Sequence, residues 1–350
     1  MDALTAHDGT AATYLRDCRR LRDALGIAPG AVLEPVPLGM GEHNLNYRFV
    51  DPGTGRAFVL RINVAKQSFH KNQVRYEYEA LTAVEPSGVT PKPLFIDDSP
   101  QAPREGVLVI AFCEGAQLDF DRLREGDLAR CARILAACHG VVPRETFLRR
   151  PDRPLGSLFA ECVERFSVYC SSPVADPHVE RRVSRLIRRA QDDLDAYEFD
   201  PREGRIVNTE PLASHFLLPD AAADGPGWFV DWERPIVGDV AEDLAFFTAP
   251  TTSFWDSEFL FPNSMAAEFL EAYWSAAGNS IVRNGFAERY NAFRRMAAVR
   301  AFTWCCRAQA LYARDRGLHH TTKAEEKIPV YLADGFLDLI EREVFDTTLG

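Results

Sequence analysis

Residues 205–247 constrain the fold of this chain more than any other segment, because they combine acidic side chains with short strand-like runs. Glu210 lies five positions before His215, and the strand-like run 227–230 leads directly into a second acid, Asp231. Short strands fix the ends of the loops that they flank, and loops held in this way commonly carry binding and catalytic residues. This pattern predicts a β-rich segment with a functional site inside a mostly helical half of the chain.

Composition narrows the class of protein. A chain of 350 residues corresponds to roughly two domains. The hydrophobic fraction of 46% is sufficient for a buried core, and the net charge of −11 argues against a nucleic-acid-binding face. An acidic balance is compatible with a cationic substrate, although it mainly favours solubility.

The cysteines and the N-terminus predict a cytoplasmic protein. None of the eight cysteines forms a CxxC pair or a zinc-binding spacing, so we expect reduced thiols. The first residues lack the apolar region of a signal peptide. No stretch approaches the roughly 18–20 apolar residues of a membrane span, so we expect no membrane partner.

The N-terminal third reads as a helix followed by a small sheet. Helical spacing covers 11–25 and 72–84, and each pattern stops at nearby glycine and proline residues. Strand-like runs occupy 32–38, 46–50, 57–63, 94–96 and 107–112.

Helical patterns dominate after Gly115. They cover 127–139, 183–194, 266–277, 290–314 and 330–345. The sequence therefore predicts an α+β chain in three parts. These are an N-terminal helix at 1–30, a β-rich part at 31–114 and a mainly helical part at 115–350.

Two runs give the chain a specific resemblance to a known family. FVDWE at 229–233 and GDVAEDLA at 238–245 resemble the Ile-Asp-Trp and Gly-Asp-Pro-x-x-Asp-Leu-Ala segments of aminoglycoside phosphotransferases and choline kinase-like proteins. The resemblance spans about residues 31–250. It implies a protein-kinase-like fold, with a small β-rich N-lobe and a larger, mainly helical C-lobe. It also implies that Asp231 ligates Mg²⁺ and that Asp239 and Asp243 brace the loops.

The same resemblance assigns the nucleotide-binding residues. Gly39, Gly41 and Asn44 lie in the hairpin loop that the family places over the ATP phosphates. Arg61 stands where the kinase strand carries its ATP lysine, and a guanidinium can pair with phosphate oxygens. Glu77 matches the helix glutamate that pairs with that cation.

The hinge that contacts adenine is assigned to 112–114. Phe112 and Cys113 follow an apolar strand there. The domain assignment places a catalytic loop at 205–218 and a metal-binding segment at 228–247.

The catalytic loop departs from the family pattern of His-Gly-Asp, four residues, then Asn. Asn208 replaces the His, Glu210 the catalytic Asp, and His215 the metal-binding Asn. Glu210 is then either a working base or an acid that only orders the loop. His215 is either a metal ligand or a side chain that hydrogen-bonds within the loop. Because imidazole suits softer ions than Mg²⁺, a ligating His215 predicts that Mn²⁺ is tolerated.

The resemblance implies an ATP-dependent phosphotransferase that moves the γ-phosphate to a hydroxyl of a small molecule. The open acceptor classes are aminoglycosides, amino alcohols, sugars and nucleosides. The alternative is a pseudokinase that binds a nucleotide or metabolite with little or no transfer activity. A minor alternative is transfer of a different nucleotide fragment by the same lobes.

Overall fold

The computed structural model describes residues 3–40, 44–64, 72–144, 147–220, 225, 227–314 and 322–349. The chain forms two compact units, and each is described by itself. The first unit contains Met1–Ala116, Pro143–Leu148 and Leu217–Pro235, and the second contains Gln117–Val142, Arg149–Phe216 and Ile236–Gly350. The predicted α+β class is confirmed, with a small antiparallel sheet in one part and mainly helices in the larger part.

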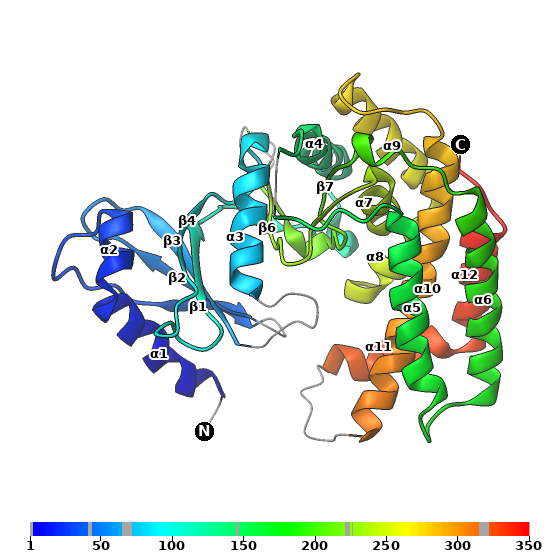
Figure 1. Ribbon diagram of the computed structural model, residues 1–350, viewed down its shortest axis with the longest axis horizontal. Coiled ribbons are helices and arrows are strands. Elements are labelled where there is room, and N and C mark those ends of the chain that lie inside the picture. The colour runs from blue at the N-terminus through cyan, green and yellow to red at the C-terminus, as the bar shows by residue number, and fades with distance from the viewer. Residues whose placement is uncertain are drawn as a thin grey trace. The chain divides into compact units, whose positions relative to one another are not determined.

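The first unit is built on a five-stranded antiparallel sheet (Figure 1). Its strands are β1 (Val36–Met40), β2 (Asn44–Val50), β3 (Ala57–Asn63), β4 (Pro93–Asp97) and β5 (Val107–Ala111). The spatial order is β1-β2-β3-β5-β4, so β3 is the central strand. A central strand has little freedom to shift register, which fixes the direction in which each of its side chains points.

Alternation along β3 separates an apolar face from a polar face. Phe58, Leu60 and Ile62 belong to the buried core of this unit. Successive strand residues point to opposite faces, so Arg61 points away from that core.

Two helices supply the rest of this core. The predicted single helix at 11–25 is instead α1 (Ala3–Asp17) and α2 (Arg19–Leu25), separated by Cys18 in an extended conformation. Leu15 and Leu21, on either side of the break, are both fully buried. The break therefore lets a leucine from each of the two helices pack into the same core. A single straight helix would present only one of its faces to that core.

Helix α3 (Gln73–Val84) carries the next functional side chains. Asn72 caps it by accepting a hydrogen bond from the Arg75 amide at 3.0 Å. A short 3₁₀ turn, η1 (Glu85–Ser87), follows, and Gly88 ends it with φ of 71°. That left-handed conformation favours glycine. The observed bounds match the predicted helix at 72–84 to within one residue.

The second unit is mainly helical. Its helices are α4 (Asp127–Gly140), α5 (Pro154–Cys170), α6 (Pro177–Ala196), α7 (Val240–Phe247), α8 (Pro250–Asp256), α9 (Asn263–Ala277), α10 (Phe286–Arg314), α11 (Thr322–Leu332) and α12 (Asp334–Ile340). Helix α10 has 29 residues and packs against α5, α6 and α7, so it runs through the centre of this unit (Figure 1). None of the described helices is both long and apolar enough to cross a membrane.

Short strands lie in the chain segments between these helices. Strands β7 (Arg205–Val207) and β10 (Ile236–Gly238) pair in the second unit. The strands β6 (Ala116–Gln117) and β8 (Phe216–Leu218) each contain a point where the chain passes from one unit to the other. Strand β9 (Trp228–Phe229) lies in the first unit, and short 3₁₀ turns occur at η2 (Phe120–Arg122), η3 (Pro201–Glu203) and η4 (Ala213–His215).

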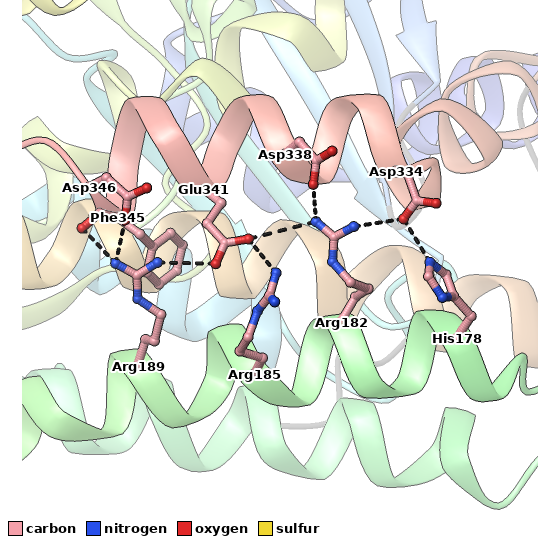
Figure 2. A network of polar contacts seen from close by, with 9 residues as sticks. All are labelled: His178, Arg182, Arg185, Arg189, Asp334, Asp338, Glu341, Phe345 and Asp346. Atoms are coloured by element: carbon pink, nitrogen blue, oxygen red, sulfur yellow. Dashed lines mark hydrogen bonds and ion pairs between the residues drawn. The ribbon is translucent and has the colours of Figure 1, made fainter.

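The C-terminal helices are tied to α6 by a row of ion pairs (Figure 2). The predicted helix at 330–345 is broken at Ala333, and a short π-helix, η5 (Glu341–Phe345), follows α12. Arg182 bonds Asp334 at 2.7 Å and also pairs with Asp338, while Arg189 binds Asp346 at 2.7 Å. The full row comprises His178, Arg182, Arg185 and Arg189 against Asp334, Asp338, Glu341 and Asp346.

Candidate active site

Arg61 is the centre of the polar cluster in the first unit. Its Nε lies 3.2 Å from Glu77 Oε2, and the two side chains are 9% and 3% exposed. The predicted pairing of this strand cation with the helix glutamate is therefore confirmed as a contact. The pairing was implied by the family resemblance, and the regular geometry of β3 and α3 explains why the two side chains meet.

Two further acids bind the same guanidinium. Arg61 Nη2 donates to Asp231 Oδ1 at 2.9 Å and also to Glu233 Oε1. Asp231 was predicted as a site residue, but Glu233 was missed. The backbone at Asp231 has a φ of 66° and is not extended, so strand alternation carried no signal for Glu233.

The segment that carries these acids is held by neighbouring elements of the first unit. Gln73 Nε2 donates to the Glu233 carbonyl at 2.7 Å, and Asn44 Nδ2 donates to the Glu233 side chain. The Trp232 ring is fully buried, and its Nε1 donates to the Phe229 carbonyl at 3.0 Å. Asn44, predicted as a phosphate-loop residue, thus belongs to the Arg61 cluster. The buried Trp232 ring therefore anchors the segment that carries both acids.

The cluster joins one cation to several acids. Among the described residues, three carboxylates contact the Arg61 guanidinium. Burial raises the pKa of Glu77, and Glu233 and Asp231 add to the rise against the opposing effect of Arg61. Burial alone would lower the pKa of Arg61, but its acidic partners outweigh burial and raise it. The pKa values of Glu77 and Arg61 therefore both depend on the same group of charges.

The donors fit a magnesium ion bound together with phosphates. No group of three or more His, Cys, Asp or Glu side chains suited to a metal occurs in the described ranges. Mg²⁺ in phosphoryl-transfer sites commonly uses one or two carboxylates and takes its other ligands from phosphates and water. Asp231 and Glu233 supply two such carboxylates, with side chains 33% and 18% exposed.

The remaining nucleotide-site predictions fall on the sheet and on the chain after it. Gly39 lies in β1 and pairs with Asn46, whereas Gly41 lies outside the described residues. Phe112 and Cys113 follow β5. The Phe112 amide donates to the Ala57 carbonyl at 3.2 Å. Burial raises the pKa of the Cys113 thiol to about 12, so this side chain is an inert thiol there.

The second unit holds the loop that carries Glu210. Asp243, on α7, accepts hydrogen bonds from the Asn208 and Thr209 amides at 2.8 and 2.7 Å. His139, at the end of α4, lies 3.1 Å from the same carboxylate through Nε2. Asp243 and His139 are completely buried. The prediction that Asp243 braces this loop is confirmed.

The loop backbone adopts an unusual conformation at Thr209. Its φ is 72°, in the left-handed region that a β-branched residue rarely occupies. The Glu210 amide donates to Asn208 Oδ1 at 3.1 Å, and the Leu212 amide donates to the Glu210 carbonyl at 2.8 Å. Backbone strain held by several hydrogen bonds is commonly found at functional sites. The substituted loop is therefore an ordered turn.

Arg300 is a second residue that sequence reasoning missed. It lies on α10, donates through Nη1 to the Thr209 carbonyl at 2.7 Å, and pairs through Nη2 with Glu210 Oε1. No local pattern in the sequence points to this contact, because 90 positions separate the two residues.

The other acids of this region are structural. Asp239 caps α7 by accepting from the Ala241 amide at 3.0 Å and pairs with Arg289 at 2.7 Å. Burial raises the pKa of Asp239, with Arg289 opposing the rise. Asp239 thus braces the start of α7, whereas the prediction was that it braces the loops.

His215 ends η4, and its amide donates to the Leu212 carbonyl at 3.0 Å.

The described geometry groups the predicted site residues into two sets. Asn44, Arg61, Glu77 and Asp231 come together in the first unit. Glu210 and His215 lie in one loop of the second unit.

Comparison with protein families assigns the chain to a family. Residues 34–297 match the model of the phosphotransferase enzyme family, so the chain belongs to that family. Comparison with the curated proteins gives no match.

Solved structures with the same fold are small-molecule kinases and related proteins. A putative aminoglycoside phosphotransferase from Ralstonia eutropha JMP134 is 13% identical, with a TM-score of 0.68 over 96% of this chain and 99% of its own. A microcompartment-associated aminopropanol kinase is 18% identical, with a TM-score of 0.62 and coverages of 94% and 98%. Choline kinase from Cryptosporidium parvum Iowa II is 14% identical, with a TM-score of 0.60 and coverages of 89% and 91%. At these identities the likeness shows the protein-kinase-like fold.

Proposed function

We propose that the protein is an ATP-dependent phosphotransferase that moves the γ-phosphate to a hydroxyl of a small molecule. The observation that carries this proposal is the Arg61 cluster. One buried guanidinium pairs with Glu77 on α3 and also meets Asp231 and Glu233. A strand cation paired with a helix acid is the arrangement that kinases use to order nucleotide phosphates.

Binding of ATP with a divalent ion would change the partners in this cluster. Mg²⁺ supplies neutralisation of the phosphate charge during transfer. Asp231 and Glu233 would hold this ion. Some N–H groups of Arg61 would then donate to phosphate oxygens, while Glu77 keeps the guanidinium in its orientation.

Glu210 is proposed as the acid that orients the acceptor hydroxyl. General-base assistance is worth about 10²–10⁴-fold in rate, and Glu retains the carboxylate of the usual Asp. His215 is proposed either as a metal ligand or as a residue that hydrogen-bonds within its loop, and Mn²⁺ should replace Mg²⁺ without loss if its imidazole ligates.

The comparisons support a small hydroxyl-bearing acceptor. One neighbour is spectinomycin phosphotransferase, crystallised with ADP and spectinomycin, and another is an ethanolamine kinase from Plasmodium vivax. We also propose a cytoplasmic location, as expected from a sequence in which no cysteines have a CxxC or zinc-binding spacing.

The test is formation of ADP by the purified chain with ATP and Mg²⁺ over a panel of aminoglycosides, amino alcohols, sugars and nucleosides. Glu210→Gln should lose at least about 10²-fold in kcat while retaining nucleotide affinity. Glu77→Gln should raise the KM for ATP. Glu79→Gln is its matched control on the same helix, because Glu79 is partly exposed and lies 3.9 Å from Arg75.

The alternative is a pseudokinase that binds nucleotide without transferring phosphate. The substitutions at positions 208, 210 and 215 favour it. Tight ATP binding by a wild-type chain that forms no ADP with any acceptor would support this alternative and reject the phosphotransferase.

A further inference from the structure

Arg300 connects the central helix of the second unit to the loop of Glu210. It is nearly buried, with a side chain 6% exposed, whereas the Glu210 side chain is 39% exposed. The guanidinium carbon also lies 4.9 Å from the centre of the Phe246 ring. A cation over an aromatic face gains additional stabilisation, more so when desolvated. Arg300 is therefore the fixed member of the pair, and Glu210 is the member that it orients.

The two arms of Arg300 bind different parts of the same turn. Nη1 binds the carbonyl of the strained Thr209, and Nη2 binds the carboxylate of the next residue. Asp243 binds the amides of the same turn from α7. The backbone is thus fixed through both its donors and its acceptors, but the Glu210 carboxylate receives its orientation from Arg300.

Such orientation matters more for Glu than for Asp. The additional methylene can displace the carboxylate by roughly 1.5 Å, about one carbon–carbon bond. A misplacement of about 1 Å at a reacting centre can cost around 10²-fold in rate. An ionised carboxylate has about four lone-pair sites, so binding to a guanidinium is compatible with accepting a hydrogen bond from a hydroxyl.

We propose that Arg300 is a positioning residue that sets the direction of the Glu210 carboxylate for the acceptor hydroxyl. This inference rests on the proposed phosphotransferase function. Neighbouring charges leave Arg300 available for this role. Glu161 pairs with Arg165, and burial raises the pKa of Glu242 to about 8, which keeps that carboxyl protonated at neutral pH.

The test compares Arg300→Met with a matched control on the same helix. Arg295→Met also removes an arginine from α10 that forms a short ion pair, here with Asp193 at 2.6 Å. Arg300→Met should lower kcat about 10²-fold and change the KM for ATP by less than about 2-fold. Arg295→Met should leave both within about 2-fold. Arg300→Lys should recover part of kcat, because it keeps the charge but cannot bind both targets as a fork.

A double-mutant cycle separates positioning from general destabilisation. If Arg300 acts through Glu210, Arg300→Met should cost nothing further in kcat when Glu210 is already Gln. If Arg300 acted elsewhere, the losses in kcat caused by the two substitutions would multiply, and that result would overturn the inference. Circular dichroism and a thermal melt of each variant establish that it is folded. If Arg300→Met does not fold, the same cycle is run with Arg300→Lys.

The outcomes distinguish this inference from the function on which it rests. An active wild type with an equally active, folded Arg300→Met variant rejects only the role of Arg300. A wild type that transfers no phosphate rejects the phosphotransferase, and the positioning role is rejected with it.

Discussion

Replacing Glu242 with Gln should change how the stability of the protein depends on pH. Glu242 lies on α7, is 6% exposed, and its Oε2 has no hydrogen-bond partner among the described residues. Burial raises its pKa from 4.5 to about 8, with Asp243 adding to the rise and Arg300 opposing it. Gln has nearly the same shape and is uncharged at every pH, so the substitution removes only the titration.

The direction of this pH dependence follows from whether the folded or the unfolded state holds the Glu242 proton. Between about pH 4.5 and about pH 8 the folded chain keeps the Glu242 proton, whereas the unfolded chain has released it. The folded state is therefore favoured at low pH, and this contribution is lost as the pH rises through that window. A shift of roughly 3.5 units at about 1.4 kcal/mol per unit gives an upper limit near 5 kcal/mol.

The measurement is urea unfolding, followed by circular dichroism, of wild type and Glu242→Gln at about pH 5 and about pH 8. The two proteins should differ by about 1 kcal/mol or less at the lower pH. At the higher pH, the variant should be more stable by several kcal/mol. Glu268→Gln, at an exposed position of α9, is the control and should follow wild type. Parallel pH profiles for wild type and Glu242→Gln would refute the reasoning.

Two further predictions concern the strained turn and the C-terminal ion pairs. Thr209→Gly should stabilise the fold by about 1 kcal/mol or less and retain kcat. The left-handed backbone at Thr209 costs about 1–2 kcal/mol, and glycine removes this cost but gives the unfolded chain more freedom. A clear loss of stability in urea unfolding would contradict this expectation. Arg182→Met should lower the free energy of unfolding by about 1 kcal/mol at low salt and by less near 1 M salt. This expectation follows because its partners Asp334 and Asp338 are 57% and 65% exposed. Arg181→Met, at an exposed position of the same helix, should have no effect, and equal losses at both salt concentrations would argue against an ionic origin.

The sequence predicted the parts of the cluster that depend on local pattern. The pairing of Arg61 with Glu77 came from the family resemblance, and strand alternation and helix periodicity explain why it holds, since they fix the direction of a side chain once the element is known. Asp231 was located by a specific run of residues next to a short strand. Gly39 and the other nucleotide contacts remain predictions, as does the metal role of His215.

The parts that could not be predicted depend on tertiary contacts. Arg300 lies on a helix that is buried on most sides, and no local pattern distinguishes it from the other arginines there. Helix α5 was missed because Gly156 and Ser157 in its first turn weaken the helical signal. The break before α12 was missed because Ala333 favours a helix, whereas the observed backbone there is extended.

The bracing by Asp243 has a consequence for how such a loop diverges. Its partners in the loop are two main-chain amides, and every residue type except proline carries such a group. Side chains at positions 208 and 209 can therefore be exchanged during evolution while the path of the turn is kept. Substitutions at these positions of the turn are therefore weak grounds for classifying a homologue as inactive.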